Sequence, residues 1–162
     1  DNNPVIFLEN EILYGRTFDV PDLEDFTVPF GKARVWREGS DVTIVSFGIG
    51  MQYALDAADK LADEGISAEV LDLRTLMPLD YDRILGSVEK TGRALVVHAA
   101  VEFCGLGSEI ASTINEDLFG KLKAPASRFG AAYAPIAYSK TIETAQVPNV
   151  GSIVARVREL VK

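Results

Sequence analysis

The sequence predicts an α/β protein: a three-layer α/β/α sandwich in which helices cover both faces of a mostly parallel sheet. Apolar runs of strand length alternate along the chain with segments of helical periodicity. These runs are apolar nearly throughout, which is typical of strands buried on both faces of a sheet. Strands joined through helices then form parallel βαβ units with right-handed crossovers. The 162 residues suit one domain, so we expect residues 1–162 to form a single unit.

The first part of the chain is the least regular. Residues 4–8 (PVIFL) predict a short strand. Residues 15–31 contain two prolines, two glycines and a cluster of acidic residues, so we expect them to form a long surface connection. Residues 33–37 (ARVWR) predict an edge strand, followed by a turn at 38–41.

A regular pattern begins after this turn. Residues 42–48 (VTIVSFG) predict a strand rich in β-branched residues, and residues 68–74 (AEVLDLR) predict the next one. Between them, residues 50–65 predict a helix that ends at Gly65. The spacing of apolar residues predicts that the buried face of this helix consists of Ala54, Ala58, Leu61 and Ala62.

The second half of the chain repeats the alternation of strands and helices. Pro78 breaks the chain before a helix that Asp80 is expected to cap and Gly92 to end. Residues 94–98 (ALVVH) and 126–130 (ASRFG) predict two further strands. Apolar stripes predict two further helices, the first at 108–119 with Ile110, Ile114 and Leu118, and the second with Val150, Ile153, Val154 and Val157.

The composition argues against several classes of function. With 16 basic and 24 acidic residues the net charge is −8, which opposes binding to nucleic acid or to an anionic membrane. No apolar run approaches the roughly 20 residues of a membrane span. The N-terminus lacks the basic start and apolar block of a signal peptide. A single cysteine cannot form an internal disulfide, which fits a reducing compartment, and a single histidine beside it makes a zinc site improbable.

The turn Gly48-Ile49-Gly50 follows a predicted strand and opens a predicted helix. A dinucleotide-binding loop occupies this position in many α/β proteins, where its backbone N–H groups face a pyrophosphate. Asp72 lies at about the distance along the chain at which that motif has its ribose-binding acid. Tyr53 stands where the third glycine belongs. We therefore favour a structural turn and keep a small-ligand or nucleotide site as the alternative.

His98 ends a predicted strand, at the edge where open parallel sheets bind ligands. Its imidazole suits acid–base chemistry, and Cys104 could act as a nucleophile beside it. The structural alternative is a histidine held by a neighbouring backbone carbonyl and a cysteine packed as a small apolar group. We favour this alternative, in which the Gly105–Gly107 turn leads into a helix capped by Ser108. No residue is assigned a catalytic, cofactor-binding or metal-binding role.

Five segments are similar in sequence to a known protein family: PVIFLENEILYG (4–15), PFGKARVWREGSDVTIVSFGIGMQYAL (29–55), GISAEVLDLRTLMPLD (65–80), KTGRALVVHAA (90–100) and FCGLGSEIASTINEDLF (103–119). In order and spacing they resemble the C-terminal half of the β subunit of the E1 component of 2-oxo acid dehydrogenase complexes. The first segments resemble the pyruvate dehydrogenase E1 β subunit most closely. The stretch from His98 to Leu122 is more similar to the branched-chain type.

The resemblance implies a transketolase C-terminal-like domain, whose fold agrees with the predicted sandwich. It also implies an α2β2 enzyme that uses thiamine diphosphate and magnesium to decarboxylate a 2-oxo acid oxidatively and passes the acyl group to lipoyl-E2. In that family the N-terminal half of β and the α subunit hold the cofactor. This chain is therefore expected to bind no cofactor, to be inactive alone, and to contact E1 α, a second β subunit and E2. The implied location is the bacterial cytoplasm or the mitochondrial matrix.

Two loops depart from the family pattern. After the strand at 94–98 the family usually has an acidic residue and then a proline, whereas this chain has alanines and a valine. Near 130–138 an acidic residue of the family pattern is replaced by aliphatic or aromatic ones. Apolar surface usually marks an interface, so one interpretation is a homo-oligomeric contact surface formed by Ala99, Val101, Phe103, Tyr133, Ile136 and Tyr138. The other interpretation is natural drift of these loops. The alternative function is an engineered, self-assembling structural module with no substrate.

Overall fold

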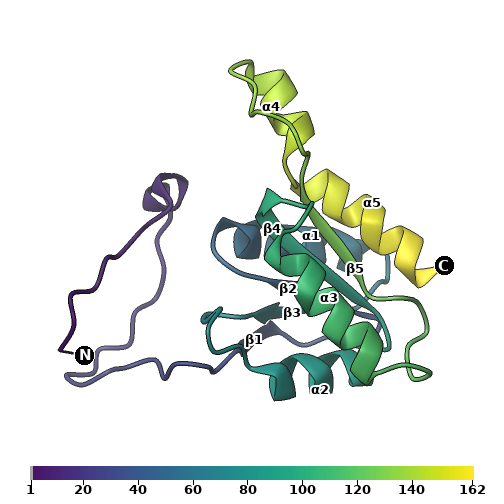
Figure 1. Ribbon diagram of the computed structural model, residues 1–162, viewed down its shortest axis with the longest axis horizontal. Coiled ribbons are helices and arrows are strands. Elements are labelled where there is room, and N and C mark those ends of the chain that lie inside the picture. Colours follow the sequence, from purple (N-terminus) through teal and green to yellow (C-terminus); the bar gives the residue numbers. More distant parts are fainter. Residues whose placement is uncertain (1) are drawn as a thin grey trace.

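The fold, seen in a computed structural model that describes residues 2–162, is a sheet of five strands with helices on both faces (Figure 1). The strand order is β1-β3-β2-β4-β5, and only β1 runs antiparallel to its neighbour. This confirms the predicted, mostly parallel α/β/α sandwich. The strands are β1 (Arg34–Arg37), β2 (Val42–Ser46), β3 (Ala68–Asp72), β4 (Ala94–Val101) and β5 (Ser127–Ala131).

Two helices pack on each face of the sheet. The α-helices are α1 (Ile49–Asp63), α2 (Tyr81–Thr91), α3 (Leu106–Asp117), α4 (Lys140–Gln146) and α5 (Val150–Val161), and a short 3-10 helix, η1, spans Glu11–Gly15. Because side chains alternate along a strand, Ile44 and Val97 pack against α1 and α5, while Val45 and Val96 pack against α2 and α3. Each face therefore has its own hydrophobic core, and all four side chains are fully buried.

The ends of α2 follow the prediction. The Oδ1 atom of Asp80 accepts a hydrogen bond from the backbone N–H of Arg83 at 3.3 Å, which caps the helix. Gly92 adopts a left-handed conformation with φ of 77° at the other end. The helix thus ends at a glycine, which adopts the left-handed conformation with little steric strain because it has no β carbon. From there the chain turns into β4.

The structure corrects three local predictions. Residues 4–8 form no strand and their side chains are exposed. Ala62 is exposed on α1, and Ala57 is buried in its place. Ser108 is not a helix cap, because α3 begins at Leu106 with Gly105 as the capping residue. The hydroxyl of Ser108 instead donates to the carbonyl oxygen of Glu102 at 3.4 Å.

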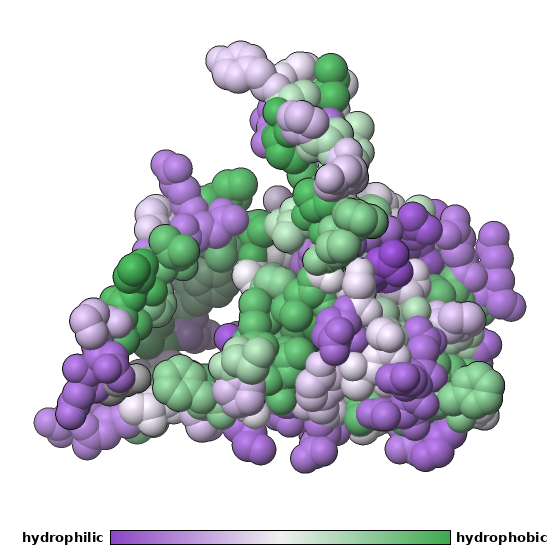
Figure 2. Space-filling model, in the orientation of Figure 1, coloured by the Kyte–Doolittle hydropathy of each residue, from purple (hydrophilic) through white to green (hydrophobic). Residues whose placement is uncertain are grey.

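Two parts of the chain extend beyond the sandwich (Figure 1). Residues 2–33 form an N-terminal arm that carries η1, and residues 132–148 form a projection that carries α4. The sequence did not predict α4, which has no buried residue. Figure 2 shows hydrophobic surface along much of the arm and a hollow between the arm and the sandwich. Within residues 2–162, no helix has the length and apolarity needed to cross a bilayer.

Candidate functional site

The two loops of the predicted contact surface lie side by side at the carboxyl ends of β4 and β5. Val101 pairs with Ala131, and the backbone N–H of Glu102 donates to the Ala131 carbonyl at 2.9 Å. Just beyond this bond the rings of Phe103 and Tyr133 meet with centroids 5.2 Å apart and planes tilted by 56°. Both rings remain largely exposed. The expectation that these loops share one edge of the sheet is confirmed.

Gly130 allows the two loops to approach each other. A β carbon at this position would lie 2.7 Å from the carbonyl oxygen of Ala100 and 2.8 Å from the backbone of Glu102. The N–H of Gly130 donates to the Oε2 atom of Glu102 at 3.3 Å, which holds the loop in place. Beside this crossing is a cavity of about 280 Å³, with Phe103, Tyr133 and Arg128 among its lining residues.

The other predicted contact residues are Ala99, Ile136 and Tyr138. Ala99 borders a small cavity of about 150 Å³ between η1, α1 and the projection. Ile136 and Tyr138 are exposed on the projection, where the sequence analysis missed a third exposed apolar residue, Ile142 of α4. The structure therefore brings Val101, Phe103 and Tyr133 together, and it leaves Ile136 and Tyr138 exposed further along the same projection.

Gln146 closes the base of the projection. Its backbone carbonyl accepts from the N–H of Ala132 at 2.8 Å, and its side-chain oxygen accepts from the N–H of Ala137 at 2.9 Å. Its side-chain amide donates to the carbonyl of Pro135 at 3.2 Å. The side-chain amide of Asn149 also donates to the carbonyl of Thr144 at 3.1 Å, so the projection is held by backbone bonds and two amide side chains, and α4 buries no residue.

His98 is a packing residue in the structure. His98 is 1% exposed, its ring stacks on that of Phe47 with centroids 6.3 Å apart, and the ring edge that carries Cε1 and Nε2 lies against the start of α3. A β carbon at Gly105 would lie 2.7 Å from Cε1 of His98, and one at Gly107 would lie 2.6 Å from Nε2. The two glycines of this turn therefore make room for the imidazole.

The polar groups of His98 are not satisfied as expected. Neither ring nitrogen has a hydrogen-bond partner within residues 2–162, so the predicted backbone carbonyl partner is wrong. Burial lowers the pKa of His98 from its ordinary value of 6.5, while the Ala100 backbone and the Glu102 carboxylate oppose this change. The imidazole is accordingly neutral at pH 7.

Cys104 does not join His98 in a catalytic pair. The thiol is exposed, so its expected role as a packed apolar group is also wrong. Its backbone has a φ of 54°, a conformation that few residues other than glycine adopt. Neither nitrogen of His98 has a hydrogen-bond partner within residues 2–162, so His98 does not act as a base toward this thiol.

The turn at Gly48 has the geometry of a structural turn. Gly48 has a φ of 56°, and a β carbon at Gly50 would lie 2.4 Å from the hydroxyl oxygen of Ser46. Both oxygens of Asp72 are engaged, since they accept from the indole N–H of Trp36 at 3.2 Å and from the N–H of Arg74 at 3.0 Å. The neighbouring cavity of about 420 Å³ has mostly apolar walls beside the Asp72 carboxylate, which would repel a phosphate. This supports the structural interpretation.

A buried carboxylate was not predicted from the sequence. Glu69 of β3 is fully buried, and its Oε2 atom pairs with the ammonium group of Lys90. The same ammonium group pairs with Glu38 at 2.7 Å, and this bond and the one to Glu69 raise the pKa of Lys90. The Oε1 atom of Glu69 has no hydrogen-bond partner within residues 2–162. The sequence did not indicate the Glu69–Lys90 pair, because Glu69 stands in an otherwise apolar strand.

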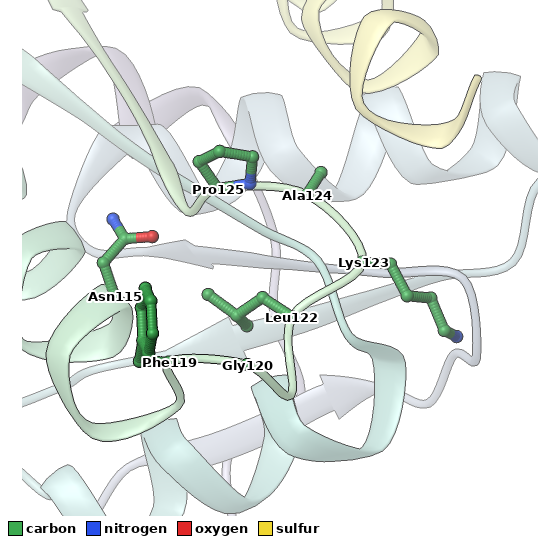
Figure 3. A pocket seen from close by; sticks show the side chains of 7 residues that line it. All are labelled: Asn115, Phe119, Gly120, Leu122, Lys123, Ala124 and Pro125. Atoms are coloured by element: carbon green, nitrogen blue, oxygen red, sulfur yellow. The ribbon is translucent and has the colours of Figure 1, made fainter.

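The opposite end of the sheet carries an open cavity of about 360 Å³ (Figure 3). Asn115 anchors its wall, because its side chain accepts from the N–H of Ala126 at 2.9 Å and donates to the Ala126 carbonyl at 3.1 Å. Figure 3 shows Phe119 and Leu122 side by side over the cavity and Lys123 directed away from it. The cavity offers apolar surface and no acid–base or nucleophilic pair.

The arrangement as a whole is that of an α/β/α domain with exposed loops at the carboxyl edge of its sheet. Residues 31–153 match the family model described as "Transketolase, C-terminal domain". The chain belongs to this family. Within residues 2–162, no group of three or more His, Cys, Asp or Glu side chains could hold a metal ion.

Curated relatives cover nearly the whole chain. It is 46% identical over 98% of its length to the pyruvate dehydrogenase E1 component subunit beta of Rhizobium meliloti (strain 1021), covering 34% of that protein. It is 44% identical over 99% of its length to the corresponding subunit of Rickettsia felis, covering 49% of it. It is 43% identical to the acetoin:2,6-dichlorophenolindophenol oxidoreductase subunit beta of Cupriavidus necator, covering 48% of it. The chain thus spans between a third and a half of these relatives.

A solved structure described as "Split gene transketolase, inactive beta4 tetramer" shares the fold. Its TM-score is 0.73 at 28% identity, with 88% of this chain and 46% of that chain covered. A 2-oxoglutarate:ferredoxin oxidoreductase from Magnetococcus marinus aligns with a TM-score of 0.55 at 15% identity, over 82% of this chain and 20% of the other. The second likeness supports the fold alone.

Proposed function

We propose that this chain is the subunit-assembling C-terminal domain of an E1 β subunit in a 2-oxo acid dehydrogenase of the pyruvate type. The proposal is supported by 46% identity to an E1 β subunit over 98% of the chain. The observation that carries the assembly role is the exposed contact of Phe103 with Tyr133. Exposed aromatic pairs of this kind are common at the centre of protein interfaces. The corresponding location is the bacterial cytoplasm or the mitochondrial matrix.

The residues of this chain do not fit thiamine diphosphate or its magnesium ion. The turn at Gly48 faces apolar walls and the engaged carboxylate of Asp72. No metal-binding cluster occurs within the described part of the chain. In the proposed function other polypeptide parts hold the cofactor, and this chain contributes contacts with E1 α, a second β subunit and E2.

The assembly role is tested by substituting the exposed rings. The double variant Phe103→Ser/Tyr133→Ser should weaken binding of the chain to an E1 α subunit in a titration. Phe119→Ser is the matched control, because Phe119 is an exposed phenylalanine at the opposite end of the sheet. Equal binding by the double variant and the control would overturn the assembly role. The purified chain with thiamine diphosphate, magnesium and pyruvate should release no carbon dioxide, and measured turnover would contradict the proposal.

Self-assembly without a substrate is the second candidate function. It is favoured by the structural relative that is described as an inactive tetramer of β chains. In this function the same rings contact a second copy of the chain. Light scattering over a dilution series should then give a discrete oligomer that Phe103→Ser/Tyr133→Ser dissociates, whereas a monomer at every concentration would exclude it.

A further inference from the structure

The side chain of His98 has two polar atoms that the fold leaves without partners. The residue is 1% exposed, and neither Nδ1 nor Nε2 has a hydrogen-bond partner within residues 2–162. A neutral imidazole has one N–H donor and one acceptor nitrogen, so a donor and an acceptor are both buried without a bond. Buried polar atoms are usually hydrogen-bonded, and an exception calls for an explanation.

The surroundings of the ring suit its neutral form only. The ring edge that carries Cε1 and Nε2 lies against the start of α3, where Gly105 and Gly107 place no side chain between the ring and the helix backbone. The first N–H groups of a helix have no partner within the helix and carry partial positive charge. Phe47 stacks on the ring and brings no charge. A proton added to the ring would therefore be repelled by the helix and shielded from water.

The elements packed around the ring carry few charged groups. The loop after β4 brings Glu102, the first turn of α3 brings Glu109, and β5 brings Arg128, while β2 has none. Burial holds the pKa of His98 below 6.5, and the Glu102 carboxylate opposes this change. Glu102 is therefore the acid whose charge favours a protonated ring.

Glu102 also anchors the loop that joins β4 to α3. Its backbone N–H donates to the carbonyl of Ala131 at 2.9 Å, and its Oε2 atom accepts from the N–H of Gly130 at 3.3 Å. Its own carbonyl accepts from the N–H of Gly105 at 3.3 Å and from the hydroxyl of Ser108 at 3.4 Å. The last three distances are long for hydrogen bonds, so these bonds are weak. A small gain elsewhere could draw the carboxylate away from Gly130.

The backbone of the loop is strained next to this anchor. Cys104 has a φ of 54°, a conformation that residues other than glycine adopt only while the surrounding structure imposes it. Phe103 lies between Glu102 and Cys104, and its ring contacts that of Tyr133 with centroids 5.2 Å apart. Releasing the carboxylate of Glu102 would thus relax the loop and shift the ring of Phe103.

We propose that His98 and Glu102 form a proton-operated switch that sets the position of Phe103. When His98 takes up a proton from the solvent, the Glu102 carboxylate leaves the N–H of Gly130 and accepts a hydrogen bond from the imidazolium. A charge-assisted bond of this kind is stronger than the bond to a backbone N–H that it replaces. The loop then follows Glu102, and Phe103 moves away from Tyr133. Loss of the proton restores the original bonds.

The switch is a property of the folded chain, so it does not rest on the proposed function. One consequence does rest on it: a subunit contact made through Phe103 should weaken as the pH falls through the folded-state pKa of His98. Histidine is the side chain best suited to such a response, because its ordinary pKa lies close to neutral pH. Testing the switch on the chain alone separates its failure from that of the assembly role.

Two residue types that occur once make the test unambiguous. His98 is the only histidine and Cys104 the only cysteine, so labelled histidine and a trifluoromethyl group attached to Cys104 each give one NMR signal. Cys104 is exposed and adjoins Phe103 in the loop. In a pH titration of the whole chain, both signals should change with one shared midpoint, at the folded-state pKa of His98 and below 6.5. Circular dichroism should show that the chain remains folded through this change.

Glu102→Gln and Glu109→Gln are the matched pair of variants. Each removes one carboxylate from an element next to the ring, and glutamine at 102 keeps an oxygen for the N–H of Gly130. Glu102→Gln should lower the pKa of His98 further and reduce the change of the Cys104 signal, because the imidazolium loses its acceptor. Glu109→Gln should leave both signals close to those of the original chain. His98→Gln should leave the Cys104 signal flat.

Four outcomes would overturn the proposal. They are a Cys104 signal that still titrates in His98→Gln, a flat Cys104 signal while His98 titrates, equal effects of Glu102→Gln and Glu109→Gln, or unfolding of the chain together with the titration. Glu102→Gln leaves the buried ring in place, so its result decides even where His98→Gln does not fold. Binding of Phe103→Ser/Tyr133→Ser to E1 α at neutral pH tests the assembly role independently of these outcomes.

Discussion

A β carbon at position 107 would lie 2.6 Å from Nε2 of His98, so the imidazole fills the space that a side chain on α3 would need. The strand and the helix approach each other closely only because one contributes a flat ring and the other contributes no side chain. The contact fixes the start of α3 against the end of β4. The loop that connects them carries Phe103, so packing beneath the loop determines where this exposed ring lies.

Gly107→Ala should destabilise the protein by about 1–3 kcal/mol through overpacking against His98. The matched control is Gly86→Ala in α2, because nothing lies within 4 Å of a β carbon there. Alanine is the better helix former, so this control should stabilise the protein by about 1 kcal/mol. Urea unfolding measures both. If the double variant His98→Ala/Gly107→Ala showed the same penalty relative to His98→Ala, steric conflict with the ring would not be its cause.

Stability should fall as the pH drops below 6.5, the ordinary pKa of histidine. The folded-state pKa of His98 is lower because the ring is buried, so below 6.5 the unfolded chain binds a proton that the folded chain does not. Above 6.5 the ring is neutral in both states and contributes no slope. Thermal unfolding at a series of pH values from about 5 to about 7 measures this pH dependence of stability, because the range includes the ordinary histidine pKa of about 6.5. His98→Gln should lose this part of the slope, and an unchanged slope would show that another group titrates.

Lys90→Met should cost about 3 kcal/mol, because it leaves the fully buried carboxylate of Glu69 without its cation. Glu38→Gln is the control. Glu38 is exposed, and this substitution removes only the outer carboxylate partner of Lys90. The control should have a much smaller effect on the free energy of unfolding. If both variants were equally mild in urea titrations, the pair with Glu69 would contribute little.

Gly130→Ala should destabilise the protein by about 2 kcal/mol, because the added methyl group meets the backbone of Ala100 and Glu102 rather than a movable side chain. Gly15→Ala is the control in the arm, where nothing lies within 4 Å. The control should leave the unfolding midpoint unchanged. A penalty at position 130 no larger than the control would mean that the two loops can separate freely.

The sandwich was predictable because its signals are local. The strands from β2 to β4 are apolar runs, and α2 is bounded by Asp80 and Gly92, whose roles depend on neighbouring residues only. Residues 4–8 were assigned wrongly because a strand needs a pairing partner, and sequence propensity does not supply one. α4 was missed because it buries no residue and therefore leaves no periodic apolar pattern.

The candidate site was predictable in part. The adjacency of the loops with Phe103 and Tyr133 follows from β4 and β5 being neighbours in a parallel sheet. The exposed position of Ile136 and Tyr138 does not follow from the sequence, because it depends on the unpredicted projection. The role of Gly105 and Gly107 could not be predicted either. Their spacing indicates a turn, but it does not reveal that the ring of His98 occupies the space where their side chains would lie.

The projection that Gln146 closes at its base has a consequence for protein engineering. Its ends are joined by the bond between Ala132 and Gln146, at 2.8 Å, and α4 buries nothing in the core. The intervening loop could accordingly be exchanged for a foreign peptide of similar span, with the flanking strand and α5 left as they are. This domain is thus a scaffold on which a grafted sequence can be displayed beyond the end of β5.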